Sequence, residues 1–218
     1  MKRTRVAVVN YGMGNIGSVV NSLELLGVES VVVKSKSDFT DIDAIILPGV
    51  GAFPRAMENF KRLGMQECLE EQVLGSEKPF LGICLGMQLL AKSSQEQGFT
   101  EGLAWIDGHV VAIESDEVPS VPHVGWNNLF LKKDDPLFSS IDEDSHFFFD
   151  HSFRFECADE ETVIANCNYG VEIVSIIRKR NIFAMQFHPE KSQRSGLKLL
   201  RNFLNYVKEK GDIGAGHA

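Results

Sequence analysis

Short apolar segments alternate with helical patterns through the first half of the chain, and this alternation most constrains the fold. The helical segments carry apolar residues three and four positions apart, while the apolar segments have the length of single strands. The expected strands are Val6–Val9, Val31–Val33, Ala44–Leu47 and Phe80–Ile83. Continuous apolar strands separated by helices predict a parallel sheet that is covered on both faces.

The pattern changes from Gly108 onward. Short strand-like segments follow one another there without long helices between them. This spacing predicts an antiparallel extension of the sheet. We therefore expect an α/β fold with a doubly wound, mostly parallel sheet and an antiparallel extension.

We expect a single domain over residues 1–210. The chain has 218 residues, which suits one domain, and no linker long enough to separate two domains interrupts it. A last helical pattern runs from Ser195 to about Lys208. Residues 211–218 are rich in glycine, and we expect them to form a disordered tail.

The composition argues against several classes of protein. Asp and Glu total 30 against 22 for Lys and Arg, and the net charge of −8 comes without a basic run, so we expect no nucleic-acid partner. We also expect no membrane partner, because no apolar stretch approaches the length of a span and no secretory leader precedes the first strand. The four cysteines form no CxxC pair, which favours reduced thiols and a cytoplasmic location.

A cysteine follows the fourth apolar strand, within the glycine-flanked segment Gly82–Gly86. Such a cysteine at a strand-to-helix junction is the thiol form of the nucleophile elbow. The glycines let the backbone turn sharply, so Cys84 stands above the sheet and the Leu85 N–H points at an oxyanion. The start of the helix favours the thiolate. A buried structural cysteine is the alternative, but the position directly after a strand favours the nucleophile.

His188 and Glu190 follow the last apolar strand and can complete such a site. A thiol nucleophile needs a base and a group that orients the base. Residues two apart in an extended chain point to the same side, and Pro189 favours that conformation. Alone, the pair would be interpreted as exposed at a strand end. Together with Cys84 at the carboxyl end of another strand, it predicts a catalytic triad.

The other candidate ligands give no sign of a metal. No pair of histidines or carboxylates has metal-ligand spacing, so we expect neither a catalytic metal nor another cofactor. His109, His146 and His217 have no partner in the sequence, and surface or core positions are expected for them.

Four segments occur in an order that resembles the class I glutamine amidotransferases. They are Pro48–Phe53, Gly82–Gln88, His151–Phe153 and Gln186–Glu190. Within this family the chain is most similar to the glutaminase subunit of imidazole glycerol phosphate synthase. The segments that carry this closer similarity are Asn10–Asn15, Pro48–Phe53, Pro122–Asn128 and His188–Ser192. The resemblance implies hydrolysis of L-glutamine to glutamate and ammonia.

The resemblance also implies a role for each matching residue. Cys84 would be the nucleophile, His188 the general base and then acid, and Glu190 the carboxylate that orients His188. The residues expected in the glutamine pocket are Gln88, Ser152 and Phe153. The residues expected to provide the oxyanion donors are Leu85 and, from the glycine loop, Gly49, Val50 and Gly51.

A partner enzyme is expected, because the amidotransferase domain accounts for the whole chain and leaves no acceptor site. The resemblance implies a heterodimer with the barrel-shaped cyclase subunit of histidine biosynthesis, which receives the ammonia. The expected contact residues are Asn15, His123 and Trp126. For Pro122–Asn128 an ordinary turn with Trp126 in the core is an equally supported interpretation.

Two residues depart from the family pattern and leave the choice of partner open. Asp150 stands where an apolar residue is common, and Phe153 where a tyrosine is common. One alternative is therefore a paralogous subunit that supplies ammonia to an enzyme amidating a surface sugar. Others are a stand-alone γ-glutamyl hydrolase, which would lack Asn10–Asn15 and Pro122–Asn128, and a non-catalytic relative, which would have a broken triad.

Overall fold

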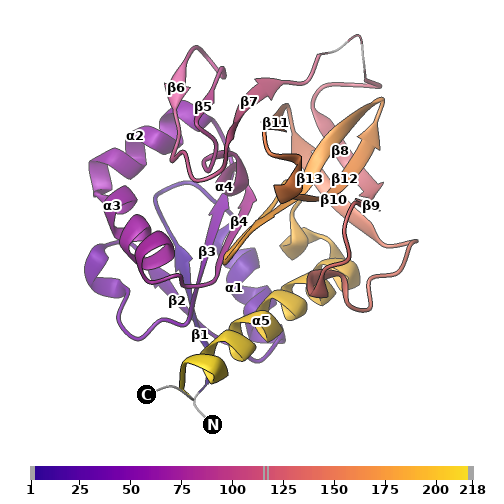
Figure 1. Ribbon diagram of the computed structural model, residues 1–218. Coiled ribbons are helices and arrows are strands. Elements are labelled where there is room, and N and C mark those ends of the chain that lie inside the picture. Colours follow the sequence, from indigo (N-terminus) through magenta and orange to yellow (C-terminus); the bar gives the residue numbers. More distant parts are fainter. Residues whose placement is uncertain (1–2, 115, 117, 216–218) are drawn as a thin grey trace.

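A mixed sheet forms the centre of the computed structural model, which describes residues 3–114, 116 and 118–215 (Figure 1). Among these residues the sheet has eight strands, in the order β2 (Glu29–Val33), β1 (Arg5–Val9), β3 (Ala44–Gly49), β4 (Phe80–Cys84), β14 (Ile182–Met185), β13 (Val171–Lys179), β12 (Val163–Tyr169) and β9 (Phe130–Leu131). The first five pair in parallel, and the remaining pairings are antiparallel. The predicted α/β fold with its antiparallel extension is confirmed.

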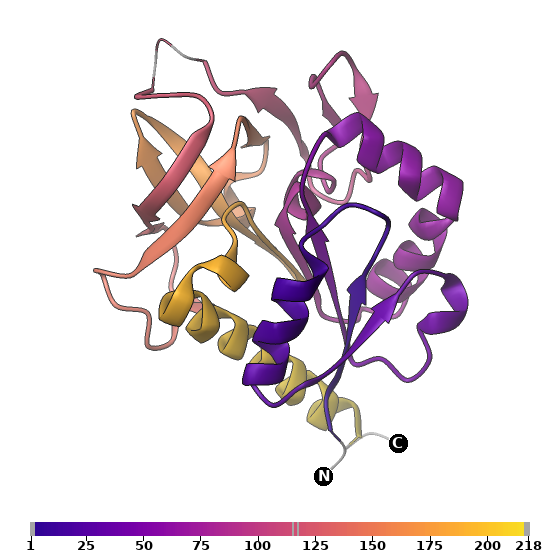
Figure 2. The same ribbon diagram turned by 180° about the vertical axis from the view of Figure 1, so that it is seen from behind.

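Helices cover both faces of this sheet, because side chains alternate along its strands. On β1, Ala7 and Val9 belong to one buried cluster, and Val6 and Val8 belong to another. The first cluster is closed by α2 (Phe53–Leu63) and α3 (Met65–Glu70), and the second by α1 (Ile16–Leu25) and α5 (Gln193–Ala215). Figure 2 shows α1 and α5 from behind, on the second face. The short helical turns are η1 (Lys36–Asp38), η2 (Glu71–Gly75), η3 (Pro136–Phe138), η4 (Glu160–Thr162) and η5 (Pro189–Lys191).

Two smaller sheets lie beside the antiparallel part of the central sheet. One joins β11 (Phe153–Cys157), β7 (Gly108–Ala112), β5 (Ser93–Ser94) and β6 (Thr100–Glu101). The other is a ribbon of β10 (His146–His151) and β8 (His123–Asn128), paired antiparallel. The ribbon matters for the site, because the carboxyl end of β10 lies against Cys84.

Residues His123–Asn128 form strand β8. The interpretation of Pro122–Asn128 as an ordinary turn with Trp126 in the core is therefore wrong. Pairing with β10 places Trp126 opposite Phe148 and holds the segment extended. The side chains then alternate, so His123 is buried while Val124 and Trp126 face solvent. Trp126 is 47% exposed. The glycine and the asparagines of this segment hide the strand pattern in the sequence.

Helix α5 continues to Ala215, past the end predicted at Lys208. Residues 211–215 are therefore helical rather than a disordered tail, and residues 216–218 lie outside the described part of the chain. Once a helix has formed, each further residue adds one hydrogen bond, and a glycine costs only about 1 kcal/mol relative to alanine. Within the described residues, no helix is both long and apolar enough to cross a membrane.

Helix α4 (Leu85–Gln88) is only four residues long, although the apolar run of the sequence continues to Ala91. The carbonyls of Leu89, Leu90 and Ala91 accept backbone hydrogen bonds from the returning segment 103–106 instead. These long-range bonds replace the next helical turn and pack the elbow against the rest of the domain.

The contact between α4 and β3 gives a direct test of the packing. A Cβ at Gly86 would lie 1.9 Å from the Leu47 carbonyl oxygen, in a central strand that cannot shift without disturbing its neighbours. Gly86→Ala should therefore lower the free energy of unfolding by about 3 kcal/mol or more, measured by urea denaturation. The matched control is Gly17→Ala on α1, where a Cβ meets nothing within 4 Å and alanine stabilises the helix by up to about 1 kcal/mol. Equal stability of the two variants would contradict the packing.

Candidate active site

The backbone turns sharply at Cys84, where β4 passes into α4. Cys84 has φ 53° and ψ −110°, a conformation that is strained for a residue with a side chain. The flanking glycines make room for the turn. A Cβ at Gly82 would lie 2.7 Å from the Gly86 carbonyl oxygen, and one at Gly86 would meet Leu47. The elbow pattern therefore has a physical cause, since neither glycine position can hold a larger residue.

The Cys84 side chain is held in an enclosed position and is 6% exposed. Its Sγ lies 3.9 Å from the carbonyl oxygen of Asp150, at the end of β10. On another side it lies 3.8 Å from Nε2 of Gln186, which follows β14. Three different elements therefore meet at the sulfur.

His188 and Glu190 form a close, buried pair directly after β14. His188 Nδ1 lies 2.8 Å from Glu190 Oε1, and both side chains are almost fully buried. The backbone around His188 is fixed as well, because its N–H donates to the Phe148 carbonyl and its carbonyl accepts from Ser192 Oγ. The expected extended conformation is present, with φ −98° and ψ 95° at His188. Glu190 therefore orients the ring and leaves Nε2 free to act on another group.

The charge on His188 follows from its neighbours. Burial by itself lowers the pKa of the His188 imidazole, but side-chain hydrogen bonds to Cys84 and Glu190 and the charges of both groups outweigh it. Together they raise the pKa of His188 to about 10. An imidazolium next to a thiol favours the thiolate, the reactive form of a cysteine nucleophile.

The loop expected to provide oxyanion donors packs on the elbow. Gly49 lies opposite Cys84 in the register of β3 and β4. A Cβ at Gly49 would lie 2.8 Å from both the Gly86 nitrogen and Leu85 Cβ. Leu85 opens α4, so its N–H belongs to the first turn, where helical N–H groups have no intrahelical partner. Leu85 and Gly49 therefore lie together at the elbow.

The outer part of this loop is open to solvent, and sequence reasoning missed a residue beneath it. Val50 and Gly51 are exposed, and Gly51 has a φ of 101° that favours glycine. Beneath the loop, the Tyr11 hydroxyl would lie 2.6 Å from a Cβ at Gly49. That hydroxyl is buried and has no hydrogen-bond partner among the described residues, and burial raises the pKa of Tyr11. The only sign of Tyr11 in the sequence was its position within Asn10–Asn15, one of the segments that carry the resemblance to the family.

The residues expected in the glutamine pocket lie together between α4 and the start of β11. Gln88 is buried, and its Nε2 donates to the Phe153 carbonyl at 3.0 Å and to Gln186 Oε1 at 3.1 Å. Ser152 is half-buried, and its carbonyl accepts from Ile113. Gln88 thus ties the 152–153 backbone to Gln186 and, through it, to Cys84.

His123 is not at the surface, which corrects its expected role as a partner contact. It is buried, with its ring stacked on Phe149 and on Tyr169 at centroid distances of 4.6 and 3.8 Å. Its Nδ1 lies 3.1 Å from His151 Nε2, and His151 Nδ1 lies 2.8 Å from the Phe153 carbonyl. A carbonyl only accepts, so His151 Nδ1 donates to it and His123 donates to His151. Alternation on β8 explains the burial, because Val124 and Trp126 take the outward face.

The remaining expected residues lie as follows. Asp150 is exposed, with its side chain 3.9 Å from Lys191 Nζ, so its carboxylate stays in water with a cation of its own chain nearby. Asn15 precedes α1 and is half-buried, and its side chain makes no capping hydrogen bond.

His109 and His146 are exposed, whereas His217 lies outside the described residues. In the described part of the chain, no cluster of histidines, cysteines and carboxylates is suited to a metal ion.

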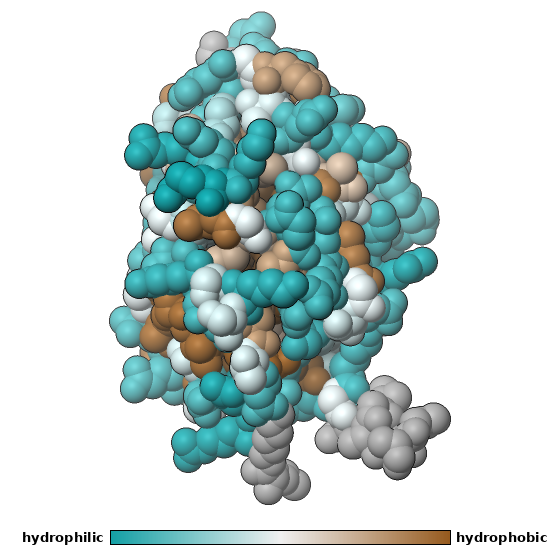
Figure 3. All heavy atoms as spheres, turned by 90° about the vertical axis from the view of Figure 1, so that its left-hand side faces the viewer, coloured by the Kyte–Doolittle hydropathy of each residue, from teal (hydrophilic) through white to brown (hydrophobic). Residues whose placement is uncertain are grey.

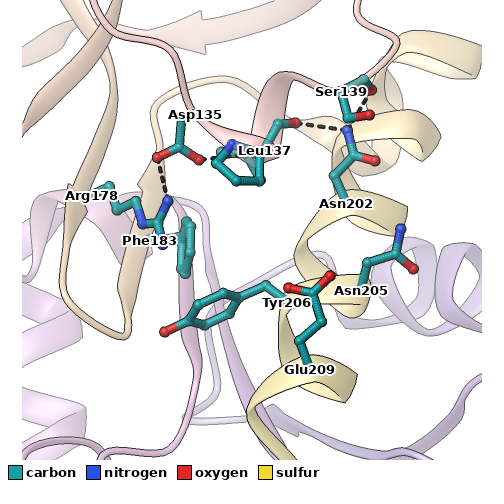
Figure 4. A pocket seen from close by; sticks show the side chains of 10 residues that line it. Asp135, Leu137, Ser139, Arg178, Phe183, Asn202, Asn205, Tyr206 and Glu209 are labelled. Carbon is teal, nitrogen blue, oxygen red and sulfur yellow. Dashed lines mark hydrogen bonds and ion pairs between the residues drawn. The ribbon is translucent and has the colours of Figure 1, made fainter.

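A separate cavity lies between η3, β13 and α5 (Figure 4). It has a volume of about 170 Å³, and its lining includes Asp135, Arg178, Asn202 and Tyr206. Asp135 accepts from Arg178, whose guanidinium also lies over the Tyr206 ring. None of the residues expected at the glutamine site lines this cavity, so it has no part in that site.

A buried cysteine, a buried histidine–carboxylate pair and a glycine loop thus lie at the carboxyl edge of the parallel part of the sheet. The family model for glutamine amidotransferase class-I matches residues 7–207. The chain belongs to the class I glutamine amidotransferases and is a glutamine amidotransferase enzyme.

Two relatives and one solved structure are similar over nearly the whole chain. Imidazole glycerol phosphate synthase subunit HisH 1 of Campylobacter jejuni is 48% identical over 198 residues, which cover 91% of this chain and 98% of the relative. Subunit HisH 2 of Vibrio vulnificus is 43% identical over 215 residues, which cover 98% and 100%. The fold is similar to that of PurLQS from Thermotoga maritima, with a TM-score of 0.72 and 22% identity over 94% of this chain and 100% of that one.

Two of the buried histidines, His123 and His151, predict a loss of stability at mildly acidic pH. Burial lowers the pKa of His151 from 6.5 to about 3, and that of His123 to about 4. The unfolded chain therefore takes up protons below pH 6.5 that the folded chain does not bind until about pH 3 to 4. The unfolding free energy should fall as the pH drops from 6.5 to 5, by about 1.4 kcal/mol per pH unit for each histidine.

Urea denaturation at several pH values measures this slope. His151→Gln should reduce this slope by about one proton, and Gln95→Asn, which replaces an exposed residue that does not titrate, should leave it unchanged. An unchanged slope in His151→Gln would show that His151 is protonated in the folded protein.

Proposed function

We propose that this chain is the glutaminase subunit of an imidazole glycerol phosphate synthase, with Cys84, His188 and Glu190 as its catalytic triad. The observation that carries the proposal is the side-chain hydrogen bond between Cys84, at the elbow, and His188 of the buried His188–Glu190 pair, beside Gly49 of the glycine loop. Cys84 and the His188–Glu190 pair come from distant parts of the chain, and a purely structural role would not require a strained cysteine beside a buried ion pair.

The first half of the reaction forms a thioester. The Cys84 thiolate attacks the side-chain amide carbon of glutamine, and the carbonyl oxygen becomes an oxyanion. The Leu85 N–H and an N–H of the Gly49–Gly51 loop donate to it, and such a donor contributes a factor of about 10²–10³ in rate. The carbon–nitrogen bond then breaks while protonated His188 gives its proton to the leaving nitrogen, so ammonia departs.

The second half hydrolyses the thioester. Neutral His188 removes a proton from water, and the hydroxide attacks the acyl carbon. The carbon–sulfur bond breaks, which releases glutamate and restores the thiolate beside the imidazolium. Glu190 keeps Nδ1 of His188 protonated throughout, so Nε2 is the atom that gives and takes the proton.

Two observations support a synthase partner. The relatives named above are subunits of imidazole glycerol phosphate synthase, and the chain covers almost their whole length. The β8–β10 ribbon carries exposed Val124 and Trp126 on one face, while its Asp150 carbonyl contacts Cys84. A cyclase subunit docked on Trp126 would therefore press on a strand that touches the sulfur. Figure 3 shows the face that lies on the left-hand side in Figure 1. That face is largely hydrophilic and carries small, separate hydrophobic patches.

The sugar-pathway alternative gains no support from Asp150. A buried Asp150 would have required a cation from an unusual partner. The side chain is instead 47% exposed beside Lys191 of the same chain. Phe153 contributes its backbone carbonyl to Gln88 and His151, which a tyrosine would do equally well.

The nucleophile is tested by substitution and labelling. Cys84→Ala should lower glutamine hydrolysis by a factor of about 10⁴ or more without changing the unfolding midpoint greatly, while the matched Cys157→Ser variant keeps its activity.

A glutamine-analogue alkylator should label Cys84 and spare the other three cysteines. Burial raises the pKa of Cys68 and raises that of Cys167 to about 11, so both thiols resist ionisation. Labelling chiefly at another cysteine would refute the assignment.

The partner surface is tested with Trp126→Ala. The variant should bind the cyclase subunit about 30-fold more weakly, because a central exposed tryptophan typically contributes about 2 kcal/mol to an interface. Binding is measured by calorimetry and by the rise in glutaminase turnover on adding the cyclase and its acceptor. The control is Leu74→Ala, since Leu74 is 49% exposed at the end of η2, before the amino end of β4.

Complementation separates the candidate partners. The chain should rescue a histidine auxotroph that lacks its own glutaminase subunit. Failure to rescue, with soluble protein and Cys84-dependent glutaminase activity, would favour the sugar-pathway enzyme. Full activity that no synthase stimulates would favour a stand-alone γ-glutamyl hydrolase.

A further inference from the structure

Gln186 lies against the sulfur of Cys84 but has no role in the triad or in the oxyanion loop. Its side chain is fully buried, and its Nε2 lies 3.8 Å from Cys84 Sγ. Its backbone N–H donates to the Ser175 carbonyl of β13 at 2.9 Å, so the position of the residue is fixed by the central sheet. A fully buried amide must satisfy its polar atoms, and here one of them faces the nucleophile.

The hydrogen bonds determine which end of the Gln186 amide faces the sulfur. Gln88 Nε2 lies 3.0 Å from the Phe153 carbonyl, which can only accept, so that atom of Gln88 must be the NH₂ group. The same NH₂ group lies 3.1 Å from Gln186 and requires an acceptor there, which is Oε1. The NH₂ group of Gln186 is thereby directed at Cys84. Reversing this amide would set two NH₂ groups against each other.

The other contacts of the sulfur make this donor significant. The Asp150 carbonyl, 3.9 Å away, accepts a hydrogen bond from the thiol but offers nothing to a thiolate. Cys84 is almost fully buried, and burial disfavours a charged sulfur unless donors compensate. His188 provides a positive charge on one side, and the Gln186 amide provides a neutral donor from a different direction.

We propose that Gln186 is a catalytic residue of this site, whose side-chain amide donates to the Cys84 thiolate and holds the sulfur charged and in place between turnovers. Gln88 is its positioning residue, because Gln88 sets the orientation of the amide. Gln186 takes no proton and forms no covalent bond. The donation increases the fraction of reactive thiolate in the resting enzyme, and the interaction weakens when the sulfur becomes a neutral thioester.

Other ionisable groups also act on the sulfur and have to be held constant in a test. His188, supported by Glu190, faces it from the segment after β14. The Tyr11 hydroxyl, just after β1, interacts electrostatically with Cys84. His151, at the end of β10, is buried near the charge of His188 and stays neutral above about pH 3. A substitution at Gln186 changes none of these groups.

The test measures the rate at which iodoacetamide alkylates Cys84 as a function of pH, with the Cys84 peptide followed by mass spectrometry. Gln186→Met keeps the size of the side chain but removes the donor. It should move the midpoint of the rate profile upward by about one pH unit, as expected for one hydrogen bond to a charged group. Gln186→Glu, which is nearly isosteric and adds a negative charge, should move it further upward and serves if the methionine variant does not fold. Gln95→Met, at an exposed glutamine, is the matched control and should keep the wild-type midpoint.

Glutamine hydrolysis provides a second measurement, which rests on the proposed function whereas the alkylation does not. In Gln186→Met, kcat/KM should fall about tenfold on the part of the pH profile below the wild-type midpoint and should match the wild type at a pH about one unit higher. If the wild type hydrolyses no glutamine, the proposed function fails, but the alkylation midpoints still decide the role of Gln186. Midpoints equal to the wild type in both variants would overturn the proposal. So would a loss of activity of the same size at every pH, because that result indicates a structural role.

Discussion

The strained turn at Cys84 is the constraint on which the rest of the site depends. A cysteine with positive φ is held between Gly82 and Gly86, and Gly86 lies so close to the Leu47 carbonyl that no side chain fits. The local strain is balanced by the surrounding sheet, which is buried on both faces. This packing places the Cys84 sulfur at the carboxyl edge of the sheet, where the Gly49–Gly51 loop and the His188–Glu190 pair also lie.

Hydrogen bonds then connect Cys84, the proposed nucleophile, to distant parts of the surface. Gln186 links Cys84 to Gln88, Gln88 links to the Phe153 carbonyl, and the same carbonyl accepts from His151. His151 belongs to the β10 strand of the ribbon whose outer face carries Trp126. Because the side chains of Gln186, Gln88 and His151 are buried and their hydrogen bonds are directional, a movement of the ribbon would reach the sulfur through these bonds. This connection gives a physical route by which a docked partner could change the reactivity of Cys84.

The sequence predicts those parts of the molecule that depend on local patterns. The parallel strands are continuous apolar runs, and the elbow and the His188–Glu190 pair follow strands directly, so spacing alone brings them to one edge. Strand β8 and the burial of His123 depend on pairing with β10, which no local pattern reveals. The orientation of Gln186 depends on Gln88, 98 residues away, and the unpartnered Tyr11 hydroxyl depends on the packing of Gly49. Helix α5 passes its predicted end because an established helix tolerates glycine at small cost.

The central claim is that Cys84 carries the glutamyl group during turnover, and trapping that intermediate tests it most directly. The protein with its cyclase partner is mixed with glutamine, quenched in acid within the first turnovers, digested and analysed by mass spectrometry. We expect a glutamyl thioester on the Cys84 peptide that disappears once the glutamine is consumed and is absent from Cys84→Ala. Ammonia release without an adduct on Cys84, or with an adduct on another residue, would contradict the account.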